Sequence, residues 1–127
     1  MISRLEDFKV YNLAMELGEV VWNVVGNWDA FQRNTIGVQL VRATDSIAAN
    51  LSEGLGRFHF KESKNFSYFS RGSLFGTKTW LTKANRRKLI GEDDIELIGR
   101  MLNAYIKSIG HISEPLEEYN VKPIPNT

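Results

Sequence analysis

Several residue types that carry chemistry are scarce in this chain of 127 residues. It has no cysteine, two histidines and three prolines. Without cysteine there is no disulfide framework and no thiolate nucleophile, so nothing indicates an oxidising compartment. No apolar run reaches the roughly 18 residues that a membrane span needs, and the charged residues near the N-terminus are unlike a secretory signal. We therefore expect a soluble cytoplasmic protein without a membrane partner.

Acidic residues are almost absent from one quarter of the chain. Between Arg57 and Lys88 nine Lys or Arg residues stand against a single acid, Glu62, and nine minus one gives this segment a charge of +8. Residues 1–56 hold four basic and seven acidic residues, and residues 89–127 hold three and seven, so the formal net charge is only +1. Such asymmetry is typical of a segment that binds a polyanion.

Apolar residues return every three or four positions rather than every two, which predicts helices and no sheet. We expect four helices, over residues 6–27, 35–54, 61–89 and 93–115. The length suits one domain. We place the helical domain at residues 1–119 and a flexible tail at residues 120–127, which contain two of the prolines.

The joints between these helices are short. Residues 28–34 are predicted to form a turn, and Gly54 and Gly56 are predicted to supply left-handed backbone where the second helix ends. Glu92 and Asp93 place acids where the fourth helix begins, and acids there complement the helix dipole. Short joints favour antiparallel neighbours, so the predicted fold class is all-α, an antiparallel up-down-up-down four-helix bundle.

Each of the last three helices has one apolar stripe that is expected to face the core. The stripes are Ile36, Leu40, Ala43, Ile47 and Leu51 on the second helix; Phe66, Phe69, Trp80, Leu81 and Ala84 on the third; and Ile95, Ile98, Leu102, Tyr105, Ile106, Ile109 and Ile112 on the fourth.

The first helix is too apolar for a simple amphipathic pattern. Apolar residues surround about two-thirds of its circumference, and only a narrow polar strip remains. That strip is Lys9, Asn12, Glu16, Glu19, Asn23 and Asn27. The second apolar flank is expected to meet another subunit, because a large exposed apolar patch is unusual on a monomer. The alternative is that the first helix lies centrally in the fold.

The third helix carries the candidate binding face. Lys64, Arg71 and Lys78 are spaced by seven and form one row, with Tyr68 and Phe75 close to it. Cations that neutralise phosphates beside rings that stack on bases are typical of nucleic-acid surfaces. The candidate set is Arg57, Lys61, Lys64, Tyr68, Arg71, Phe75 and Lys78. The alternative is an ordinary solvated helix face whose rings and cations contact another subunit.

Residue sets typical of catalytic sites are sparse. His59 and His111 have no second metal ligand at the usual spacing, and Ser46 with Asp45 and His59 lacks a nucleophile-elbow glycine pattern. Asn50, Glu53 and Arg57 share a helix face, where they either lock the joint between the second and third helices or contact a ligand. We expect no enzyme activity, no cofactor, no metal and no small-molecule substrate.

Two blocks of sequence carry a resemblance. They run from Gln39 to Arg57, including Ser46-Ile47-Ala48-Ala49-Asn50-Leu51-Ser52-Glu53-Gly54, and from Phe69 through Arg71-Gly72-Ser73-Leu74. They resemble the bacterial four-helix bundle family of the 23S rRNA intervening-sequence proteins, over about residues 5–119. The resemblance implies a homopentamer with no established enzymatic activity. Some members are encoded within insertions in large-subunit ribosomal RNA genes.

The family is also similar to the accessory variability determinant of diversity-generating retroelements, a basic pentamer that binds nucleic acid and a reverse transcriptase. This chain lacks the strong basic excess of those proteins, and it has Gly76 where many relatives have glutamate. The resemblance therefore assigns the matched residues to fold and assembly rather than to a ligand. They are Arg42, Asn50, Glu53, Arg57, Arg71 and Ser73.

Two functional hypotheses follow. In the first, a homopentamer contacts RNA or a nucleoprotein through the basic face of the third helix. In the second, the protein is an interaction scaffold without nucleic-acid binding, and the basic row serves subunit packing or a protein partner.

Overall fold

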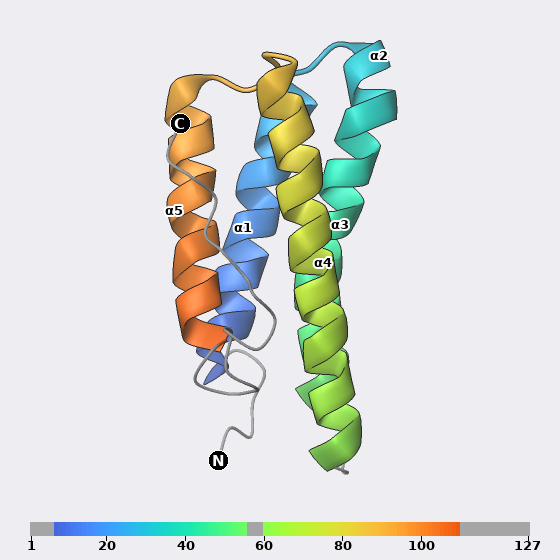
Figure 1. The fold of residues 1–127 in the computed structure, drawn as a ribbon, viewed down its shortest axis with the longest axis vertical. Helices are drawn as coiled ribbons and strands as arrows, with labels where there is room; N and C mark the ends of the chain where they lie inside the picture. The colour runs from blue at the N-terminus through green and yellow to red at the C-terminus, as the bar shows by residue number, and fades with distance from the viewer. Residues whose placement is uncertain (1–6, 56–59, 110–127) are drawn as a thin grey trace.

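The computed structural model describes residues 7–55 and 60–109, with side chains described from Phe69 onward in the second range. Four long helices are present: α1 (Lys9–Gly26), α3 (Val38–Leu55), α4 (Phe60–Arg86) and α5 (Glu92–Ile109). They lie side by side, and successive long helices run in opposite directions (Figure 1). Residues 7–55 and 60–109 contain no strand, and the predicted all-α class with four long helices is confirmed.

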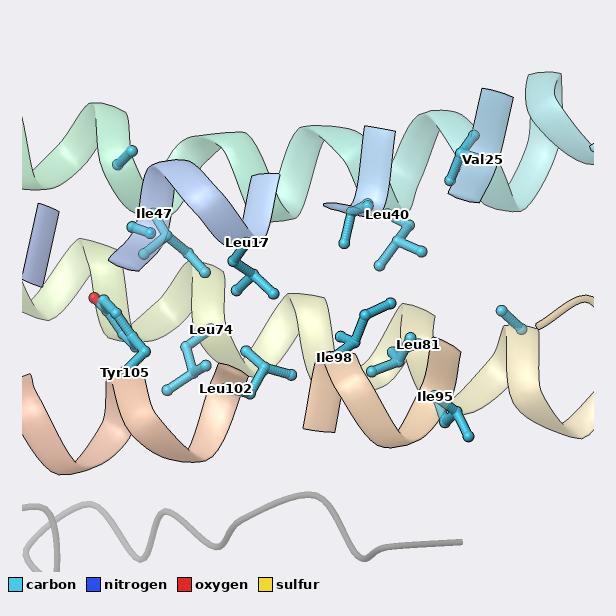
Figure 2. Packing of buried hydrophobic residues seen from close by; sticks show 14 of the residues in the cluster. Leu17, Val25, Leu40, Ile47, Leu74, Leu81, Ile95, Ile98, Leu102 and Tyr105 are labelled. Carbon is cyan, nitrogen blue, oxygen red and sulfur yellow. The ribbon is translucent and has the colours of Figure 1, made fainter. Parts of the chain in front are cut away.

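Buried side chains from all four long helices point into one shared interior (Figure 2). Leu17 of α1, Leu40 of α3, Leu81 of α4 and Leu102 of α5 have no exposed surface. The stripes predicted for α3 and α5 are confirmed where side chains are described, except that Ala43 is half-buried. Apart from the segments left out of the structure, no helix is both long enough and apolar enough to cross a bilayer.

The first helix has the two apolar flanks that its sequence predicts. Val10, Ala14, Leu17, Val21 and Val25 are buried against the core. On the side next to α3, by contrast, Met15 is 45% exposed and Trp22 is 61% exposed. The polar strip of this helix is exposed throughout. A second apolar surface is therefore left uncovered in the single chain.

The second helical segment starts earlier than predicted. The turn predicted over residues 28–34 ends at Asp29, because Asp29 begins a capping box: its carboxylate accepts the backbone N–H of Gln32 at 2.8 Å, and the Gln32 side chain accepts the N–H of Asp29. This cap starts α2 (Ala30–Gln32), which continues through the π-helical η2 (Arg33–Gly37) directly into α3. Asp followed three residues later by Gln is the signal that identifies such a helix start.

Only one of the two glycines predicted to supply left-handed backbone at the end of this helix can be checked in the structure. Gly54 is buried inside α3, which runs on to Leu55, while Gly56 lies outside the described residues. A left-handed residue does follow the next helix, because Lys88 has a φ of 60° just after α4. There the N–H of Lys88 donates to the Asn85 carbonyl and the N–H of Leu89 donates to the Ala84 carbonyl, which is a Schellman motif with lysine in place of the usual glycine.

Two glycines in helical segments differ in their surroundings and give a testable contrast. A Cβ atom on Gly37 would lie 2.7 Å from Cγ1 of Val25, whereas one on Gly72 would meet nothing within 4 Å. We expect Gly37→Ala to lower the free energy of unfolding by about 1–3 kcal/mol through overpacking. Gly72→Ala should raise it by up to about 1 kcal/mol through helix propensity. Urea unfolding of both variants tests this, and equal signs for the two changes would contradict the packing seen at Gly37.

Polar groups connect α3, α4 and α5 inside the core. The hydroxyl of Ser70 on α4 donates to the backbone carbonyl of Ile47 on α3 at 3.1 Å. It also lies 2.7 Å from the hydroxyl of Tyr105 on α5. Because the only hydroxyl hydrogen of Ser70 goes to Ile47, Tyr105 is the donor in that contact. Nearby, the Asn50 amide donates to the Ser73 hydroxyl at 3.4 Å, which joins α3 to α4 a second time.

Candidate nucleic-acid interface

The buried face of α4 differs from the predicted one. The core-facing residues are Ser70, Leu74, Thr77, Leu81 and Ala84, spaced by three and four. Leu81 and Ala84 were predicted correctly. Phe69, predicted to face the core, is 59% exposed. Ser70 and Thr77 occupy core positions that the apolar pattern did not include. The buried face of α4 therefore lies closer to Arg71 than predicted.

Arg71 is consequently part of the interior. It is 2% exposed, and its positive charge lies close enough to Tyr105 to act on the pKa of that hydroxyl. The prediction that Arg71 lies in an outward basic row with Lys64 and Lys78 is therefore wrong for Arg71. Its burial fits the role in fold and assembly that the family resemblance implies.

Two other candidate residues lie on the flank of α4 next to Arg71. Phe75 and Lys78 follow Arg71 by four and seven residues, so they share one side of the helix. Phe75 is 39% exposed and Lys78 is half-buried. A ring and a cation thus reach one surface together, as the sequence predicted.

The remaining candidates cannot be placed in space. Lys61, Lys64 and Tyr68 belong to α4, but their side chains lie outside the described residues, as does Arg57 altogether. Their part in binding stays a prediction. The same is true of the Glu53–Arg57 pair and of both histidines.

The exposed cations gather at the end of α4. Lys83, Arg86, Arg87 and Lys88 are all exposed there, and Lys83 Nζ lies 5.2 Å from the centroid of the Trp80 ring. The helix ends at Arg86, and cations there complement the negative end of the helix dipole. Together with Lys83, these exposed cations form a surface that phosphates can reach. The signal for it in the sequence was the absence of any acid between Glu62 and Glu92.

A groove runs between α1 and the start of α3. It has a volume of about 440 Å³, and its lining includes Trp22, Val38, Arg33 and Arg42. Two arginines and no acid line this groove. One wall of this groove is the uncovered apolar flank of α1, and residues of η2 add to its lining.

Farther along the same two helices, the charge reverses. A second groove of about 330 Å³ is lined by Met15, Glu19 and Asp45 among small residues. Partial burial, followed by the nearby Glu19 carboxylate, raises the pKa of Asp45. The α1–α3 surface therefore has a basic end and an acidic end.

The described residues do not form a recognisable catalytic or metal site. Within residues 7–55 and 60–109, no group of three or more His, Asp or Glu residues is placed to hold a metal ion. The Ser46 hydroxyl donates to the Arg42 carbonyl of its own helix at 2.7 Å, as helical serines commonly do. Glu92, Asp93 and Asp94 occupy the first turn of α5, where acids complement the helix dipole.

Comparison with known proteins agrees with the resemblance carried by the two sequence blocks. No curated protein matches the chain. The family model described as 23S rRNA-intervening sequence protein matches residues 6–111. This match includes all four long helices and most of the chain, which therefore belongs to the 23S rRNA-intervening sequence protein family.

Proposed function

We propose that this protein is a non-catalytic, oligomeric four-helix bundle that contacts RNA through the exposed basic surface of α4. The observation that carries the proposal is the group of exposed cations Lys83 and Arg86 at the end of α4 and Arg87 and Lys88 directly after it, with no acid between Glu62 and Glu92. The family name refers to 23S rRNA, which makes a structured ribosomal RNA the first polyanion to test.

The chemistry of contact follows from the side chains on this helix. Arginine and lysine neutralise phosphates and release counterions, and exposed rings such as Phe75 supply a surface on which bases stack. Lys78 extends the surface toward the N-terminal half of the helix. Arg71 takes no direct part, because its guanidinium is enclosed by the fold.

The test is fluorescence anisotropy of a labelled, structured ribosomal RNA fragment titrated with the protein at several salt concentrations. Replacing Lys83, Arg86 and Arg87 with alanine should make the log–log salt slope shallower by about 2–3 units, since each lost phosphate contact removes about 0.7–0.9. Lys9→Ala, which removes an exposed cation from α1, is the control and should leave the slope unchanged. An unchanged slope in the triple variant would contradict the proposal.

The second candidate function is a protein scaffold without RNA binding. The exposed apolar residues favour it, above all Trp22 and Phe31, which is 77% exposed. A scaffold predicts no RNA binding even at low salt. It also predicts that changes at Trp22 weaken assembly, whereas changes at Arg86 have no effect on any binding measured.

A further inference from the structure

The outer surface of α5 carries charge in a definite order. Asp93, Leu97, Arg100 and Ala104 are exposed and recur every three or four residues, so they form one outward strip. The first turn of the helix is acidic, Leu97 follows, and Arg100 and then Lys107 make the far end basic. This surface is the α5 strip.

The α1–α3 surface carries the opposite order. Arg33 and Arg42 line the groove at the end where α1 stops and η2 begins, together with the exposed ring of Trp22. Glu19 and Asp45 line the groove farther along. Followed from the end where α1 stops, the α1–α3 surface is first basic, then aromatic and then acidic. Followed from the same end, the α5 strip is first acidic, then aliphatic and then basic.

The two surfaces are also level with each other. The end of α1, the short α2 and the start of α5 all lie at one end of the fold (Figure 1). Trp22 is four residues from the end of α1 and Leu97 five residues from the start of α5, which at 1.5 Å per residue is about 6 Å and about 8 Å. By the same count, Glu19 lies about 10 Å and Arg100 about 12 Å from that end.

We propose that the α1–α3 surface of one copy of this chain, which includes both grooves, binds the α5 strip of a second copy that stands parallel to it. Trp22 then packs on Leu97 of the partner subunit, Arg33 faces the acidic first turn, and Glu19 faces Arg100 of the partner subunit. The opposite orientation would bring the acidic first turn of α5 onto Glu19 and Asp45, and like charges brought together at an interface cost several kcal/mol.

The exposed pair that Arg100 makes does not prevent this. Arg100 Nη1 lies 2.9 Å from Oε1 of Glu96 on its own helix, with both side chains more than half exposed. Exposed pairs of this spacing contribute little to stability, so Arg100 can exchange Glu96 for Glu19 of the partner subunit at little cost. At the groove, the neighbour's arginine would also relieve the repulsion between Glu19 and Asp45.

The geometry has a consequence for the kind of assembly. Because the two surfaces differ, each copy offers one to each neighbour, and the contact is heterologous. Parallel copies at the same level show no shift along the long axis, so repeating the contact gives a closed ring where the rotation between copies divides a full turn. Lys83, Arg86 and Arg87 of α4 belong to neither surface. This inference rests on the oligomeric part of the proposed function and gives that assembly its interface.

A charge swap tests the pairing. Glu19→Lys and Arg100→Glu each place like charges opposite one another, and each should weaken association at least tenfold. In the double variant Glu19→Lys/Arg100→Glu the charges are opposite again, and association should return. Molar mass by light scattering after size-exclusion chromatography, over a range of protein concentrations at low salt, is the readout. Lys83→Glu, an equal change outside both surfaces, is the control and should leave the mass unchanged.

The possible results distinguish the proposed interface from assembly itself and from RNA binding. Single variants that keep the wild-type mass, or a double variant that stays dissociated, would overturn the interface while leaving assembly and RNA binding in place. A monomeric wild-type chain would overturn assembly itself. Circular dichroism checks that the variants fold, and Trp22→Ala supplies a second route to the same interface: it should also weaken association, and an unchanged mass would count against the pairing.

Discussion

Replacing Arg71 with alanine is expected to lower the free energy of unfolding by about 2–5 kcal/mol. Arg71 is the largest of the fully buried side chains in the described structure, and its charge acts on the nearby Tyr105 hydroxyl. Truncation to alanine removes its methylene contacts and leaves a cavity in the core. Chemical denaturation followed by circular dichroism measures the change.

Two companion variants separate the causes of that loss. Arg71→Met keeps most of the volume, so the difference between the methionine and alanine variants gives the packing contribution. Lys83→Ala removes an exposed cation from the same helix and should stay within about 0.5 kcal/mol of wild type. If Arg71→Ala were as mild as Lys83→Ala, Arg71 would not be the structural residue that its burial indicates.

The second large effect is expected at the buried hydroxyls of Ser70 and Tyr105. Ser70→Ala removes the acceptor for the Tyr105 hydroxyl, which stays buried without a partner, at a cost of about 1–3 kcal/mol. Tyr105→Phe should cost less, about 1 kcal/mol, because Ser70 still donates to the Ile47 carbonyl. The double variant should be no less stable than Ser70→Ala alone, because the stranded hydroxyl is gone. Urea unfolding of the four proteins completes the cycle, and additive losses would contradict this coupling.

Alkaline pH supplies an independent test at Tyr105. Burial raises the pKa of the Tyr105 hydroxyl, while the nearby Arg71 charge opposes that shift. Since the folded chain holds this proton more tightly than the unfolded chain, the contribution to stability is complete below about pH 10 and is lost as the pH rises above it. Tyr105→Phe has no such proton, so its stability should fall less steeply above pH 10. Parallel pH curves for the two proteins would contradict the assignment.

Much of the fold follows from the apolar pattern alone. The stripes of α3 and α5 contain mostly large aliphatic residues at spacings of three and four, and burial of such stripes is the dominant stabilising term. The uncovered second flank of α1 was also predicted, because Met15 and Trp22 exceed what one core can enclose. These predictions succeed where hydrophobicity alone decides which side of a helix is buried.

The predictions for α4 failed where side-chain hydrogen bonds decide. Ser70 and Thr77 occupy core positions because each hydroxyl bonds to a backbone carbonyl, which removes the cost of burying it. A pattern that counts only apolar residues passes over them and chooses Phe69, so the buried face is assigned to the wrong side. The same pattern then assigns Arg71 to the exposed face of α4. The burial of Arg71 depends on the helices packed against α4, and the spacing of residues along α4 alone does not predict it.

The predictions for the joints between helices differ from the structure for a related reason. The capping box of Asp29 and Gln32 could have been read from the sequence, and it would have moved the helix start to Ala30. The left-handed residue Lys88 could not, because lysine has no preference for positive φ and only the Schellman hydrogen bonds hold it there. At the end of α3, the helix continues past Gly54, while Gly56 lies outside the described residues.

The central claim is that RNA contacts the exposed cations of α4, and lysine reactivity tests it most directly. The protein is acetylated with a limiting amount of reagent, with and without the ribosomal RNA fragment, and modification at each lysine is measured by mass spectrometry. We expect Lys83 and Lys88 to lose reactivity when RNA is present, while Lys9 and Lys107, exposed on α1 and α5, keep theirs. Unchanged reactivity of Lys83 and Lys88 under conditions where the RNA is bound would contradict it.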